Sequence, residues 1–111
     1  MRPFSYKRAA DISEAIREAS VSGVKFIAGG TNLIDLMKED VERPTRLVDI
    51  NQLSLNKIEE KPDGGLRLGA LVRNSDAAYD QRVAGRYPLL ASALLAGASP
   101  QLRNAATIGG N

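Results

Sequence analysis

The first half of the chain alternates between helical and strand-like spacing of its apolar residues. Over residues 12–19 apolar positions recur every three or four residues, which predicts an amphipathic helix with Asp11 as its N-cap and Gly23 as its terminator. Compact apolar runs at 24–28 and 46–50 predict buried strands, and the chain begins with a short extended stretch. This order of elements predicts a small α/β unit with a partly parallel sheet.

A second helix is expected directly after the strand at 24–28. Thr31 is its predicted N-cap, and Leu33, Leu36 and Met37 share its predicted apolar face. Beyond Asn51 the pattern of apolar and polar residues changes. There we expect a hairpin of 57–61 and 66–71 around the turn 62–65, a short helix at 74–80 capped by Asn74 or Ser75, a helix at 87–96 with Leu89, Leu90, Ala93 and Leu94 on one face, and a loop from 98 to 111.

Composition removes several classes of chemistry. The 111 residues include no His, Cys or Trp, so the commonest general base, the commonest metal ligand and all thiolate chemistry are missing. Any redox reaction would therefore depend on a bound cofactor. The net charge of +2 and the few aromatic residues argue against nucleic acid as a partner, and no apolar run is long enough for a membrane span.

Two glycine pairs stand in suggestive places, in "AGGTN" at 28–32 and "TIGGN" at 107–111. Bare backbone lets a phosphate approach consecutive N–H groups, and a helix that begins at Thr31 would add partial positive charge. A plain turn with one left-handed glycine is the favoured interpretation of either pair taken alone. Neither pair fits the P-loop or the Rossmann fingerprint, which leaves a diphosphate that is held without hydrolysis.

Taken together, the segments resemble a known family. "KFIAGGTNLIDLMK" followed by "LLAGASPQLRNAATIGGN", with "RLVDIN" and "LRLGALVRNSD" between them, is similar to the flavin-binding subunit of the molybdenum hydroxylases. That family includes xanthine dehydrogenase, carbon monoxide dehydrogenase and periplasmic aldehyde oxidoreductase. The resemblance implies an α/β (α+β) fold, the truncated N-terminal portion of a two-subdomain FAD-binding domain of the vanillyl-alcohol-oxidase (PCMH) type. Residues 1–54 would form the first FAD-binding subdomain and 55–111 the incomplete second one.

The resemblance also implies which residues contact FAD, while it assigns no catalytic or metal-binding residue to this chain. The implied cofactor-binding residues are Ile27, Ala28, Gly29, Gly30, Thr31, Asn32 and Leu33 in the first segment, Gln101 on the approach to the second, and Thr107, Ile108, Gly109, Gly110 and Asn111 within it.

In the family, electrons pass from a molybdopterin subunit through the [2Fe–2S] clusters of an iron–sulfur subunit to FAD and then to an external acceptor. The resemblance therefore implies an electron-transfer subunit of a hetero-oligomeric oxidoreductase, with the molybdenum cofactor in a partner. We expect this fragment alone to be inactive, and to self-associate or pair with the rest of the subunit. We expect it in the cytoplasm, and export to the periplasm with a partner stays open. The alternatives are an assembly module that does not retain FAD and an unrelated binder of a phosphorylated metabolite.

Overall fold

The computed structural model describes residues 1–110, and its chain contacts divide it into two compact units. Unit 1 is Met1–Leu53, and unit 2 begins at Ser54. That these units are two FAD-binding subdomains stays a prediction. Within residues 1–110 no helix is long and apolar enough to cross a membrane.

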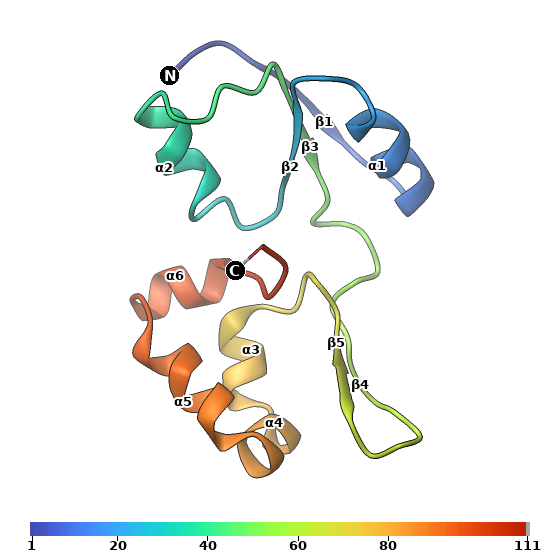
Figure 1. The fold of residues 1–111 in the computed structure, drawn as a ribbon, viewed down its shortest axis with the longest axis vertical. Helices are drawn as coiled ribbons and strands as arrows, with labels where there is room; N and C mark the ends of the chain where they lie inside the picture. The colour runs from blue at the N-terminus through green and yellow to red at the C-terminus, as the bar shows by residue number, and fades with distance from the viewer. Residues whose placement is uncertain (111) are drawn as a thin grey trace. The chain divides into compact units, whose positions relative to one another are not determined.

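Unit 1 is a three-stranded parallel sheet with two helices, as the apolar pattern predicts. The strand order is β1-β3-β2, with both outer strands parallel to the central β3. The helices lie on opposite sides of the sheet (Figure 1). In chain order the elements are β1 (Ser5–Arg8), α1 (Ile12–Ala19), β2 (Val24–Ile27), α2 (Leu33–Lys38) and β3 (Arg46–Asp49).

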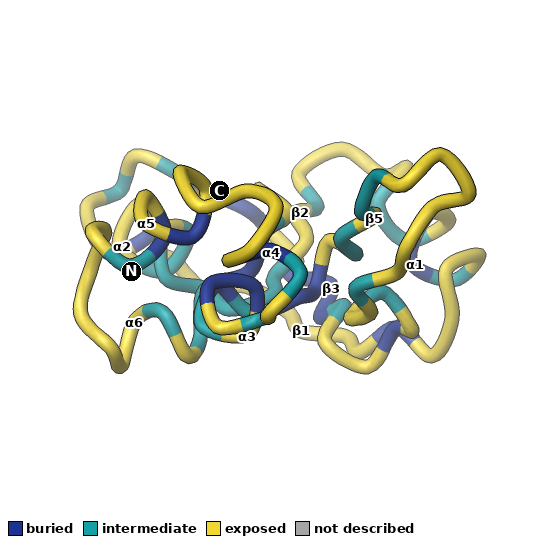
Figure 2. Tube along the Cα trace, turned by 90° about the horizontal axis from the view of Figure 1, so that it is seen from below, coloured by how far each residue is buried: buried dark blue, intermediate teal, exposed yellow. Residues whose placement is uncertain are grey.

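The core of unit 1 gathers around its central strand. Leu47 and Val48 of β3 are almost completely buried, and the tube of Figure 2 is dark blue there. A parallel strand covered on both faces reads as a continuous apolar run, which is why the sequence pattern predicts it correctly. The helices bury less than expected. Ala15 and Met37 are buried, whereas Ile16 is 63% exposed and Leu36, assigned to the apolar face, is 40% exposed.

One predicted helix cap is confirmed and another is wrong. The side chain of Asp11 accepts a hydrogen bond from the backbone N–H of Glu14 at 2.7 Å, as a capping box requires. At the second helix, Asn32 and not Thr31 occupies the N-cap position, and no side-chain cap bond forms there. The backbone N–H of Ile34 already donates to the carbonyl of Gly30, so the helical turn starts without a side-chain acceptor.

Over its described residues, 54–110, unit 2 combines a hairpin with four short helices. The hairpin is antiparallel, and Gly64 in its turn has φ +88°, as the turn sequence predicts. Two of these helices, α4 and α6, are not predicted by the sequence pattern, which indicates no element at 81–86 and a loop at 98–111. The elements are β4 (Ile58–Glu60), β5 (Leu66–Leu68), α3 (Asn74–Tyr79), α4 (Gln81–Arg86), α5 (Pro88–Ala96) and α6 (Pro100–Ala105).

The two unpredicted helices each have an identifiable N-cap. Asp80 accepts hydrogen bonds from the backbone N–H groups of Arg82 and Val83, which begins α4. Ser99 accepts from the N–H of Leu102, and Pro100 follows it in the first turn of α6. At α3 the N-cap is Arg73, so the expected cap at Asn74 or Ser75 is wrong by a residue or more.

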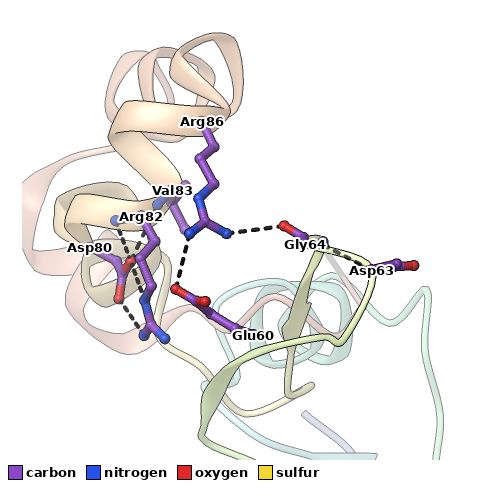
Figure 3. Close-up of polar contacts among 8 residues, drawn as sticks. Glu60, Asp63, Gly64, Asp80, Arg82, Val83 and Arg86 are labelled. Carbon is purple, nitrogen blue, oxygen red and sulfur yellow. Dashed lines mark hydrogen bonds and ion pairs between the residues drawn. The ribbon is translucent and has the colours of Figure 1, made fainter.

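A polar cluster joins the hairpin to α4 (Figure 3). The guanidinium of Arg86 pairs with the Glu60 carboxylate at 3.0 Å and donates to the carbonyl of Gly64 at 3.0 Å. Beside it, Asp80 pairs with Arg82 at 3.0 Å. Arg86 thus links the hairpin to α4. These groups lie at the surface of unit 2, where ion pairs contribute little stability individually.

The helices of unit 2 enclose a small apolar core. Val72, Ala77, Ala78 and Leu94 form it, and part of α3 is dark blue in Figure 2. The predicted face of α5 is partly wrong, because Leu89 is 82% exposed while the side chains toward the core come from Ala91 and Leu94. A helix that is apolar all round has no polar face to indicate its orientation.

Candidate cofactor-binding segments

The first glycine segment connects the carboxyl end of β2 to α2. Ile27 is the last residue of β2, and residues 28–31 follow it as a half-buried loop. Gly30 has φ +75°, a conformation that side chains with a Cβ rarely adopt. A Cβ there would lie 3.2 Å from Cγ1 of Ile34. The turn alone therefore accounts for Gly30, whatever else the segment does.

The same segment offers backbone donors. The N–H groups from Gly29 to Leu33 have no hydrogen-bond acceptor within residues 1–110, and these residues are half-buried except for Asn32, which is exposed. Unpaired, partly buried N–H groups normally find a partner in water or a ligand. Consecutive amides of this kind suit a phosphate or diphosphate. Since α2 spans only Leu33–Lys38, we attribute this capacity to the loop amides and not to a helix dipole.

A side-chain network lies behind this segment, at the carboxyl end of β3. Asn51 donates from its amide Nδ2 to the carbonyl of Ala28 at 2.9 Å and to Oδ1 of Asp49 at 2.8 Å. Its backbone N–H donates to the same Asp49 oxygen at 2.8 Å. The other carboxylate oxygen accepts from the hydroxyl of Tyr6 and lies 3.9 Å from Nε of Arg8. Asp49 is only 8% exposed, so its charge is held by hydrogen bonds.

The electrostatics of Asp49 follow from these contacts. Burial by itself raises the pKa of a carboxyl group, but the hydrogen bonds from Tyr6 and Asn51 and the charge of Arg8 together outweigh burial. The pKa of Asp49 is therefore held below its ordinary value. The carboxylate is ionised at neutral pH and accepts both hydrogen bonds from Asn51.

The second glycine segment uses its backbone differently. The N–H of Ile108 donates to the carbonyl of Val72 at 2.9 Å, and the N–H of Gly109 donates to that of Ala70 at 2.8 Å. Thr107 is buried and forms an isolated antiparallel bridge with Arg73. The amides of Ile108 and Gly109 are thus occupied by the fold of unit 2.

Packing explains one glycine of this pair. A Cβ on Gly109 would lie 2.8 Å from Cβ of Ala70 and 3.0 Å from its carbonyl oxygen, so only glycine permits this approach. Gly110 has φ +79° and open space around it. Gln101 lies exposed on α6. Asn111, the last implied contact, falls outside the described residues.

Sequence reasoning missed the pair formed by Asp49 and Asn51. Both residues stand in the quoted "RLVDIN", but their only signal was an acid and an amide directly after a buried strand. The sequence also offers Arg103 as a contact for phosphate or a partner subunit. In the structure its Nη1 donates to the carbonyls of Leu95, Gly97 and Ala98 and so caps the end of α5.

Comparison with known proteins identifies the family of this chain. Residues 2–111 match the family model described as the FAD binding domain in molybdopterin dehydrogenase. The chain belongs to this family. The chain is 57% identical to the aldehyde oxidoreductase FAD-binding subunit PaoB of Escherichia coli K12, across all of the chain and 35% of that relative. It is 35% identical to the carbon monoxide dehydrogenase medium chain of Hydrogenophaga pseudoflava, across 97% of the chain and 38% of that relative.

Solved structures agree on the fold. A carbon monoxide dehydrogenase structure from Hydrogenophaga pseudoflava superposes with a TM-score of 0.90 at 35% identity, covering 98% of this chain and 39% of the other. Quinoline 2-oxidoreductase from Pseudomonas putida 86 gives 0.89 at 34% identity, covering 96% and 38%. The α/β fold is therefore shared with part of each of these chains. The chain spans little more than a third of the length of the relatives it matches.

Proposed function

We propose that this chain forms the FAD-binding part of an electron-transfer subunit in a molybdopterin-containing hydroxylase or dehydrogenase of the aldehyde or xanthine oxidoreductase type. FAD, when bound, supplies the redox chemistry that a chain without His and Cys lacks. The observation that carries the proposal is the run of amides from Gly29 to Leu33 that have no hydrogen-bond acceptor among the described residues, in a chain of the FAD-binding family.

In this proposal the residues of the chain bind and orient FAD, and none of them is catalytic. The first segment, Ile27 to Leu33, would hold the diphosphate through its backbone N–H groups. The second segment, Thr107 to Gly110, would line the cofactor with its remaining free backbone and side-chain atoms, because two of its amides are already paired. Gln101 would contribute only a surface contact.

The proposed partners follow from the named relatives. PaoB is named an FAD-binding subunit and the carbon monoxide dehydrogenase relative a medium chain, so both belong to larger assemblies. We propose an iron–sulfur subunit and a molybdopterin subunit as the partners of this chain. Self-association, or pairing with the rest of the subunit, and a cytoplasmic or exported location remain predictions.

One observation favours a second candidate, an assembly module that no longer holds FAD. Gly30 is accounted for by its backbone conformation and Gly109 by its contact with Ala70, so neither glycine needs a ligand to explain it. Family membership favours flavin over an unrelated phosphorylated metabolite. The two remaining functions differ in one measurable property, retention of the flavin.

The test is a binding competition that separates the parts of FAD. The purified chain is incubated with FAD, passed through a desalting column and examined by its visible spectrum and flavin fluorescence. We expect FAD to be retained, ADP to displace it, and riboflavin, which lacks the phosphates, to compete poorly. A colourless protein after saturation with FAD would support the assembly module, and displacement by riboflavin with no effect of ADP would contradict a diphosphate site in the first segment.

A further inference from the structure

The side chain of Asn51 fixes one peptide group at the start of the first glycine segment. Its Nδ2 donates at 2.9 Å to the carbonyl oxygen of Ala28, the residue directly before Gly29. In a planar trans peptide the N–H points opposite to the C=O of the preceding residue. Because the carbonyl of Ala28 is held toward Asn51, the N–H of Gly29 is held away from it, on the far side of the same peptide plane.

The other end of the amide run is fixed by the helix itself. The carbonyl of Gly30 accepts from the N–H of Ile34 at 3.1 Å, so the N–H of Thr31 points away from α2 by the same reasoning. Between these two anchors the chain passes through the positive φ of Gly30. Asn51 is thus the one side chain among the described residues that hydrogen-bonds to the loop from Ala28 to Asn32.

Asn51 is itself held in place from two directions. Oδ1 of Asp49 accepts both its backbone N–H and its Nδ2, each at 2.8 Å, which defines the rotamer of the amide. Tyr6 and Arg8 of β1 approach the second oxygen of Asp49, so the carboxylate cannot swing away without breaking contacts to a neighbouring strand. The chain of contacts runs from β1 through Asp49 and Asn51 to the loop.

We propose that Asn51, held by Asp49, is a positioning residue that pre-orients the Gly29 amide for the phosphate of the bound cofactor. The proposal rests on the proposed function and extends it from the loop to the strand behind it. Donors that already point at a charged group need no reorganisation on binding, and this lowers the entropic cost of binding. Asn51 is exposed, so its loss should affect the ligand more than the fold.

The experiment compares Asn51→Ala with Arg46→Ala in the whole chain. Arg46 is the matched control because it lies at the opposite end of β3, where its guanidinium bonds to Glu18 at 2.9 Å and to Ser5 at 3.0 Å. The first measurement, without FAD, is the backbone ¹⁵N order parameter of residues 29–33. We expect it to fall from about 0.85 to below about 0.6 in Asn51→Ala only.

The second measurement is the dissociation constant of FAD, followed by flavin fluorescence. We expect it to rise about tenfold in Asn51→Ala, as for loss of the hydrogen bond from the Gly29 N–H to the charged phosphate, and to be unchanged in Arg46→Ala. Asn51→Gln, which keeps the donor, should recover part of the affinity. Equal FAD affinity in Asn51→Ala and Arg46→Ala would overturn the inference while the proposed function stands. Absence of FAD binding by the natural chain would overturn the proposed function, and the order parameters would still decide whether Asn51 orders the loop.

Discussion

Alanine substitution at two glycines separates the role of the first segment as a turn from its role as a ligand site. Gly30 and Gly64 both have positive φ, +75° and +88°. Placing a side chain in the left-handed region costs about 1–2 kcal/mol at either position. At Gly30 the added Cβ also lies 3.2 Å from Cγ1 of Ile34, whereas nothing lies within 4 Å of it at Gly64. Both variants should therefore unfold several degrees below the natural chain.

Only Gly30→Ala should weaken the binding of FAD. A change in backbone angle at Gly30 turns the adjoining amides away from the diphosphate, which we expect to raise the dissociation constant about tenfold. At a concentration of FAD 100 times the natural dissociation constant, bound FAD stabilises the natural chain and Gly64→Ala by about 2.7 kcal/mol. The same concentration should stabilise Gly30→Ala by only about 1.4 kcal/mol.

The assay is thermal or urea unfolding of all three proteins with and without FAD. Comparing each protein with itself removes the intrinsic stability cost, because that cost is present in both measurements. An equal FAD-induced gain in Gly30→Ala and Gly64→Ala would refute the ligand role and leave Gly30 as a turn residue. A loss of the gain in both variants would mean that unfolding of either unit releases FAD, and would refute the local explanation.

Three further predictions test the fold around the segments. Gly69→Ala should destabilise unit 2 by about 2–4 kcal/mol in urea unfolding, since its Cβ would collide with the carbonyl of Leu55, whereas Gly85→Ala, in open space on α4, should stabilise by up to about 1 kcal/mol. The pKa of Asp49 is lowered in the folded chain, so the stabilisation by its carboxylate is present above the ordinary aspartate pKa and is lost as the pH falls through the lowered pKa. Asp49→Asn should therefore reduce the fall of unfolding free energy at acid pH by up to about 1.4 kcal/mol per pH unit. Arg103→Ala, which removes a guanidinium from three carbonyls, should cost about 1–3 kcal/mol by the same unfolding assay, and an unchanged midpoint would contradict its role as a cap.

Local patterns predicted the parts of the fold that local physics decides. The apolar run around Val48 indicated a covered parallel strand, and the Asp11 cap indicated the start of α1. The start of α6 also has a local signal, Ser99 followed by Pro100, but the weak helical periodicity of residues 98–111 favoured a loop. Helices of six residues carry less than two turns of periodicity, too little for the spacing of apolar residues to reveal them.

Contacts between distant residues could not be predicted in the same way. The need for glycine at 109 comes from Ala70, which is far away in the sequence, and the support of Ala28 comes from Asn51 across the sheet. Nothing in the local amino-acid sequence of either segment specifies those partners. The orientation of α5 was unpredictable for another reason, since Leu89 and Ala91 are both apolar and only packing decides which is buried.

The two glycine segments have similar sequences, yet their backbone N–H groups differ in hydrogen bonding. In the first, the amides from Gly29 to Leu33 have no acceptor within residues 1–110, and the side-chain amide of Asn51, itself held by the buried Asp49, donates to the carbonyl of Ala28 just before them. In the second, the amides of Ile108 and Gly109 already donate to the carbonyls of Val72 and Ala70, in the turn before α3. A diphosphate needs donors that are free and fixed in direction. The first segment meets both conditions, so we expect it to provide most of the phosphate affinity, whereas substitutions in the second should act mainly through the stability of unit 2.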